Sequence, residues 1–189
     1  MTSESNSRSA RRTKHLFKDA LVRLLETESF ACISVKDIVE TAEYNRTTFY
    51  NHYYDKYDLL DDLTQDLLDG LATAIRSSFK TYHPGQRTPM KASEITIFDY
   101  VHQHRQAISL CFQNDVQKKL TLKSLDTIYQ ELMATWTTLI NAPEKQLASD
   151  ARLFTYTLAG TINGWMDDNF RTPPDEIRAS FVAYHNQAF

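Results

Sequence analysis

The sequence predicts an all-α protein of about nine helices, and three observations support this fold class. Only four glycines and five prolines occur in 189 residues, too few for a sheet whose tight turns need φ above zero. Long segments are rich in Leu, Ala, Lys, Glu and Asp. Apolar residues in these segments return every three or four positions, as on one face of an amphipathic helix.

The N-terminus is expected to begin with a disordered basic arm over residues 1–12, which show no apolar periodicity. The helical pattern starts at Thr13 and continues to about Glu28. The first eighteen residues hold five basic side chains and only one acidic one, although the whole chain has a net charge of −3. A basic end on an acidic body is typical of a protein that binds nucleic acid at that end.

Two short helices are expected to follow. Ser34, with Asp37 three residues later, is a helix-start signature, and Asn45 opens the next helix after the turn residues Glu43 and Tyr44. A supporting helix followed by two short helices and a tight turn is the helix-turn-helix arrangement. The predicted helix-turn-helix domain covers residues 13–55.

The rest of the chain is expected to form a larger helical domain. Leucines at helical spacing predict a connecting helix over residues 56–80, and a segment rich in proline and glycine predicts a loop over residues 81–93. Residues 94–189 then carry further helices, separated at Pro143 and restarted at Pro174.

Cys32 and Cys111 stand beside apolar residues and form no Cys-x-x-Cys pair, so we expect buried thiols, with a redox role or a disulfide as the alternative. The polar N-terminus lacks the apolar core of a signal peptide, and the longest apolar stretch, residues 153–166, is too short to span a bilayer. We therefore expect a cytoplasmic protein that does not contact membranes.

The third predicted helix has the chemistry of an element that reads DNA. On a helical period Phe49 and Tyr53 face inward, and the residues opposite them are polar. An arginine can bond guanine, a threonine can contact thymine, and tyrosine, histidine and lysine suit phosphate oxygens. Helix N-terminal amides can also approach a phosphate. The predicted DNA contacts are Ser34, Lys36, Tyr44, Asn45, Arg46, Thr47, Thr48, Tyr50, Asn51, His52 and Lys56.

These residues lie within a resemblance to a known family. The run Thr48-Phe-Tyr-Asn-His-Tyr-Tyr-Asp-Lys-Tyr-Asp-Leu-Leu60 resembles the (T/S)-(F/L)-Y-x-H-F-x-x-K-x-x-L-L stretch of TetR/AcrR-type repressors. The upstream run Ile33-Ser-Val-Lys-Asp-Ile-Val39 resembles their second helix, and the match covers about residues 13–62. The resemblance implies a homodimer whose first three helices bind double-stranded DNA. It also implies a C-terminal domain that dimerises and often encloses an effector pocket.

The turn departs from the family pattern, which usually has Ala-Gly-Val where this chain has Ala42-Glu43-Tyr44. Glycine adopts φ above zero freely after a helix, so Glu43 must do so at a cost or the turn must differ. Tyr44 replaces a small aliphatic residue and is expected to reach the DNA backbone or to pack outside the core.

The C-terminal half carries weaker signals. Gly160 and Gly164 lie on one helix face and suit either a dimer interface or close packing against a helix of the same chain. His102, Trp136 and Phe154 are candidates for an effector pocket, with the hydrophobic core as the alternative for the aromatic rings. The effector is expected to be a small molecule or a partner protein. No metal site, cofactor or catalytic residue is predicted.

Two other classes of function were weighed against a DNA-binding repressor. An enzyme is disfavoured because no G-x-S-x-G, P-loop, G-x-G-x-x-G or H-E-x-x-H motif is present. A helical adaptor that kept this fold but lost DNA binding should have a damaged recognition helix, whereas Arg46, Tyr50, His52 and Lys56 are all present. Activation in place of repression is compatible with the same sequence.

Overall fold

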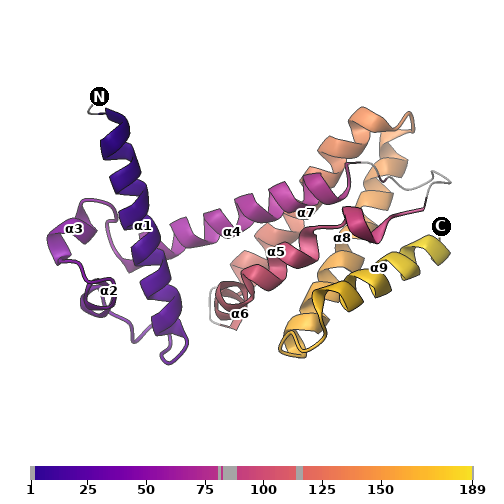
Figure 1. The fold of residues 1–189 in the computed structure, drawn as a ribbon. Helices are drawn as coiled ribbons and strands as arrows, with labels where there is room; N and C mark the ends of the chain where they lie inside the picture. The colour runs from indigo at the N-terminus through magenta and orange to yellow at the C-terminus, as the bar shows by residue number, and fades with distance from the viewer. Residues whose placement is uncertain (1–2, 81, 83–88, 114–116, 189) are drawn as a thin grey trace.

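The computed structural model describes residues 3–80, 82, 89–113 and 117–188, which form α-helices and one short 3₁₀ turn (Figure 1). No strand occurs among these residues, so the predicted all-α fold class is confirmed. The helices are α1 (Ser3–Leu25), α2 (Val35–Thr41), α3 (Arg46–Tyr50), α4 (Lys56–Ser78), α5 (Ile97–Gln103), α6 (Arg105–Gln113), α7 (Gln117–Leu139), α8 (Glu144–Asp167) and α9 (Pro174–Ala188), with the 3₁₀ turn at Ala92–Glu94.

The first helix begins much earlier than expected. α1 starts at Ser3, so the prediction of a disordered arm over residues 1–12 is wrong for the described part of that segment. No proline or glycine interrupts residues 3–25, and the Thr13 hydroxyl donates to the Ser9 carbonyl one turn earlier, at 3.0 Å. Apolar periodicity indicates a buried face, and residues 8, 9, 11 and 12 of α1 are exposed, so this part of the helix shows no such pattern.

The predicted caps of the two short helices are present. The Ser34 side chain accepts from the Asp37 amide, and the Asp37 carboxylate accepts from the Ser34 amide at 2.8 Å, which completes a capping box at the start of α2. The Asn45 side chain accepts from the Thr48 amide at 2.8 Å and starts α3.

The turn between α2 and α3 is left-handed at Glu43, where φ is +58°. The Tyr44 amide donates to the Val39 carbonyl at 2.8 Å, and the Glu43 amide donates to Glu40. These two bonds form a Schellman motif, which usually has glycine at the position of Glu43. The turn therefore has the geometry that glycine usually adopts, and Glu43 adopts it with a side chain at positive φ.

α4 connects the two parts of the molecule (Figure 1). Its N-terminal half lies beside α1, and its C-terminal half packs against α5 and α7. Most of its buried side chains are leucines at helical spacing, as the sequence predicts: Leu59, Leu60, Leu63, Leu67, Leu68 and Leu71.

The C-terminal helices enclose an aromatic core. Phe154 on α8 lies between Phe79, Trp136 and Phe181, with ring centroids 4.7, 5.6 and 5.6 Å away. The Trp136 indole N–H donates to the Tyr82 carbonyl at 3.0 Å, so this fully buried ring has no unpaired donor.

Cys32 is exposed, contrary to the expected buried thiol. It lies between the buried residues Phe30 and Ile33, which turn inward and leave the cysteine outside. Its sulfur accepts from the Ser29 hydroxyl at 3.3 Å. The expectation for the side chain of Cys111, and those for the loop residues 81 and 83–88, lie outside what the structure describes.

Candidate functional site

The face of α3 that points away from the protein is polar. Arg46, Thr47, Tyr50 and Asn51 are exposed, whereas Phe49 is completely buried. The amphipathic division of this helix is therefore confirmed. Side chains suited to base and phosphate contacts project from the outer face of this short helix, and Phe49 anchors its inner face.

An aromatic cluster holds α3 in place. The Phe17 ring on α1 lies 5.3 Å from the Phe49 ring and 6.3 Å from the Tyr53 ring. Tyr44 is half-buried, and its ring lies 5.3 Å from Phe17, so the turn residue packs against the core. The bulky residue that replaces the family's small aliphatic one thus contributes to the support of α3.

Two predicted DNA contacts already have structural roles. The side-chain oxygen Oδ1 of Asn45 accepts from both the backbone amide and the hydroxyl of Thr48, at 2.8 and 3.0 Å. These bonds use the side-chain oxygen of Asn45 and the hydroxyl proton of Thr48 to begin α3. The predicted contact at His52 stands just after α3, where the residue is half-buried.

Backbone carbonyl groups hold the ammonium of Lys56, which does not lie on an open surface. Its ammonium donates to the Phe30, Ala31 and Ile33 carbonyls at 2.8, 3.1 and 2.7 Å. An ammonium has three donors, and all three are used here. In this structure Lys56 joins the start of α4 to the turn after α1, and the phosphate contact at this residue stays a prediction.

Asp62 joins α4 to α1 and to the residues after α3. Its carboxylate accepts from the Tyr53 hydroxyl at 2.7 Å and pairs with Lys14 and Lys18 at 3.2 and 3.1 Å. Burial alone raises the pKa of Asp62, but the hydrogen bonds from Tyr53 and Lys18 hold it below its ordinary value. Two of the basic residues near the N-terminus are thus engaged within the protein.

The start of α2 offers two further predicted contacts. Ser34 and Lys36 are exposed, and Lys36 forms only a surface pair with Glu40 at 3.7 Å. The hydrogen bonds from Ser34 lower the pKa of Asp37, so its carboxylate stays ionised beside the N-terminus of α2.

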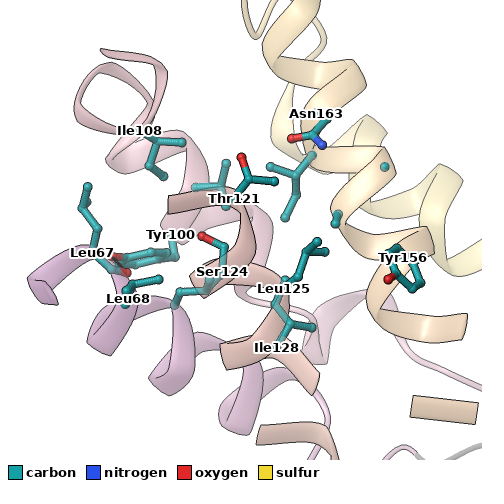
Figure 2. A pocket seen from close by; sticks show the side chains of 15 residues that line it. Leu67, Leu68, Tyr100, Ile108, Thr121, Ser124, Leu125, Ile128, Tyr156 and Asn163 are labelled. Carbon is teal, nitrogen blue, oxygen red and sulfur yellow. Dashed lines mark hydrogen bonds between the residues drawn. The ribbon is translucent and has the colours of Figure 1, made fainter. Parts of the chain in front are cut away.

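A cavity of about 240 Å³ lies between α4, α7 and α8 (Figure 2). Leucines of α4 form one wall, and Ser124, Leu125 and Ile128 of α7 lie across from Tyr156 of α8. None of the described side chains that line it is charged. An apolar cavity with a few hydroxyl groups has the character of a small-molecule site.

The residues predicted for the effector pocket do not line this cavity. Trp136 and Phe154 belong to the buried aromatic core, and His102 stacks on Trp165 with ring centroids 5.8 Å apart. For the two aromatic residues the core alternative is observed, because large rings fill the core while the cavity is left between leucines and small residues. Sequence reasoning missed Tyr100 and Leu67, although Gly70 inside a helix was a signal of close packing nearby.

Gly160 and Gly164 stand on the exposed side of α8. A Cβ atom placed on either glycine meets no other atom within 4 Å. The alternative that they pack against a helix of the same chain is therefore not observed in the described part of the structure. Leu153 and Tyr156 on the same side of this helix are 58% and 62% exposed.

Metal-binding and membrane-spanning features are both absent from the described residues. No group of three or more potential metal ligands gathers among the described residues. In the same part of the chain, no helix has the length and apolar character needed to cross a membrane.

A helix-turn-helix unit with an exposed polar third helix, joined by one long helix to a helical body, defines a DNA-binding transcription regulator. Comparison with known proteins identifies the family. The model of a TetR-type transcriptional regulator C-terminal region matches residues 91–187, about half of the chain. The chain belongs to the TetR family of transcription regulators.

The relatives agree with this assignment. The chain is 28% identical over 93 residues to the uncharacterized HTH-type transcriptional regulator YxbF of Bacillus subtilis strain 168. This alignment spans 49% of the chain but only 24% of that relative.

Solved structures share the fold over nearly the whole chain. A TetR-family regulator from Syntrophomonas wolfei has a TM-score of 0.69 at 13% identity, with 94% of this chain and 95% of that one covered. The dihydroxyacetone kinase operon activator DhaS has the same TM-score at 15% identity, covering 91% and 93%. The repressor AlkX of Dietzia gives 0.53 at 21% identity, covering 92% and 97%.

Proposed function

We propose that this protein is a cytoplasmic repressor that binds a pseudo-palindromic operator as a homodimer and leaves it when an effector binds. The single observation that carries the proposal is the exposed polar face of α3, with Arg46 and Thr47 in its first turn and Phe49 anchored behind them. Arg46 and Thr47 read bases, and Tyr50 contributes to phosphate binding. Dimer symmetry places two such helices in successive major grooves, about 34–36 Å apart.

The exposed side of α8 supports the homodimer. Leu153 and Tyr156 are apolar and exposed, and Gly160 and Gly164 leave room for a second backbone on the same strip. A two-fold axis brings this strip of α8 against the same strip of a second copy. Leu153 and Tyr156 of one copy then fill the space beside the glycines of the other.

The cavity between α4, α7 and α8 supports the effector site. Its volume of about 240 Å³ and its uncharged described lining suit a small, largely apolar molecule with one or two hydrogen-bonding groups. Thermal-shift screening of neutral compounds tests this assignment. A true effector raises the melting temperature of the wild type. Ala159 lies in the cavity wall, so Ala159→Trp should fill the cavity and abolish that shift.

Selection of bound sequences from random duplex DNA tests the function itself. The proposal predicts enrichment of one inverted repeat, bound by two protomers. The absence of any enriched sequence would overturn it and favour an adaptor that kept the fold without binding DNA.

A further inference from the structure

Tyr100 on α5 forms part of three hollows, two of which are also lined by Leu67. Its ring and Leu67 line the cavity between α4, α7 and α8, and they also line a second groove of about 390 Å³. The far wall of that groove is made by α1 residues, including His15, Lys18 and Val22. Figure 2 shows Tyr100 beside Leu67 at the edge of the cavity, and the same two residues line the groove whose other wall is α1.

The ring of Tyr100 is seated directly on α4. Its hydroxyl donates to the Leu67 carbonyl at 2.8 Å. A Cβ atom on Gly70 would come within 2.5 Å of the Cε2 and Cζ atoms of the ring, so only glycine allows this close approach. Burial and the nearby Asp66 and Asp69 carboxylates raise the pKa of Tyr100 to about 12, and the hydroxyl therefore keeps its proton for the bond.

The same stretch of α4 is tied to the DNA-binding helices. Asp62 and Asp66, one turn before Leu67 and Gly70, pair with Lys18 of α1 at 3.1 and 2.5 Å. The Lys18 side chain is almost buried and that of Asp62 is largely buried, whereas Asp66 reaches Lys18 from the exposed side of α4. These ion pairs connect the stretch of α4 near Gly70 to α1, and Phe49 of α3 packs against Phe17 of α1.

We propose that Tyr100, seated on Gly70, is the positioning residue that links the cavity to the DNA-binding helices. This inference rests on the proposed function, because the linkage matters only if the cavity binds an effector and α3 binds DNA. With the ring seated, α4 is fixed on α5 and the two DNA-binding units of a dimer keep one spacing. A molecule that pushes the ring off Gly70 frees α4, and fewer protomers then have the spacing that fits the operator.

A double-mutant cycle separates this linkage from ordinary packing. Gly70→Ala forces the ring off its seat and should weaken binding to the selected operator about tenfold. In a Tyr100→Ala background the added methyl meets no ring, so Gly70→Ala should change the affinity less than about twofold. Equal losses in both backgrounds, or operator binding by Gly70→Ala like that of the wild type, would overturn the inference.

Tyr100→Phe provides a milder variant that keeps the ring and loses only the bond to Leu67. It should weaken operator binding about threefold with little change in the melting temperature. Tyr129→Phe, at another half-buried tyrosine, should leave the affinity unchanged. Identical behaviour of the two variants contradicts a role for the Tyr100 hydroxyl.

Amide hydrogen exchange of the full-length protein tests the linkage without DNA. Gly70→Ala should speed exchange in α1 around Lys14 and Lys18, and the effect should vanish in the Tyr100→Ala background. Exchange in α1 that is unaffected by Gly70→Ala overturns the inference even when operator binding is normal. Failure to enrich an operator, with the predicted exchange pattern intact, counts only against the proposed function.

Discussion

Lys56 stabilises the junction between α1 and α4, because its ammonium satisfies three backbone carbonyls. Lys56→Met should lower the free energy of unfolding by about 1–3 kcal/mol, because it leaves the part-buried Phe30 and Ile33 carbonyls without this partner. Urea unfolding measures this loss. The salt dependence of DNA binding should keep its slope. Lys36→Met, at an exposed lysine that is itself a predicted DNA contact, should leave the free energy of unfolding unchanged and reduce that slope. A normal stability with a slope reduced by about one would restore Lys56 as a phosphate contact.

Glu43 has a backbone conformation that suits glycine. Glu43→Gly should therefore raise the free energy of unfolding by up to about 1 kcal/mol, because a left-handed residue with a side chain is strained. The control is Glu40→Gly, one turn earlier inside α2, which should cost about 1 kcal/mol through helix propensity. If both glycines destabilise the protein equally, the positive φ at Glu43 carries no strain.

Among the elements, the pairing of α1 with α4 through Asp62 makes stability depend on pH. A carboxylate whose pKa is lowered by folding stabilises the protein above its unfolded pKa, and this contribution is lost as the pH falls through the lowered folded value. The wild type should therefore lose stability below about pH 4 more steeply than Asp62→Asn. Chemical unfolding at several pH values tests this, with Asp126→Asn, at an exposed carboxylate of α7, as the control. Parallel curves for wild type and Asp62→Asn would contradict the assignment.

The sequence predicted those elements whose signals are local. The cap at Ser34 and Asp37, the start of α3 at Asn45 and the inward face of Phe49 all depend on residues within one or two turns. The structural role of Lys56 could not be predicted because its three carbonyl partners lie more than twenty positions earlier in the chain. The lining of the cavity could not be predicted either, because leucines that line a hollow and leucines that fill a core follow the same periodicity.

At the scale of the whole molecule, the exposed strip on α8 predicts how two copies associate. Leu153→Glu should weaken the dimer, because it places a charge where an apolar side chain meets the partner. Leu139→Glu, at an exposed leucine at the end of α7, should leave association unchanged. Sedimentation velocity over a range of concentrations gives the comparison. Equal dimer stability in both variants would move the interface away from α8.

The account as a whole depends on α3 as the element that reads DNA. The most direct measurement is the affinity of Arg46→Ala for the duplex selected by the wild type and for its single-base variants. The expected loss is about 1–3 kcal/mol, with discrimination relaxed at one base pair of each half-site. Arg171→Ala, at an exposed arginine beyond α8, should bind like the wild type. Wild-type affinity and base preference in Arg46→Ala would contradict the central claim.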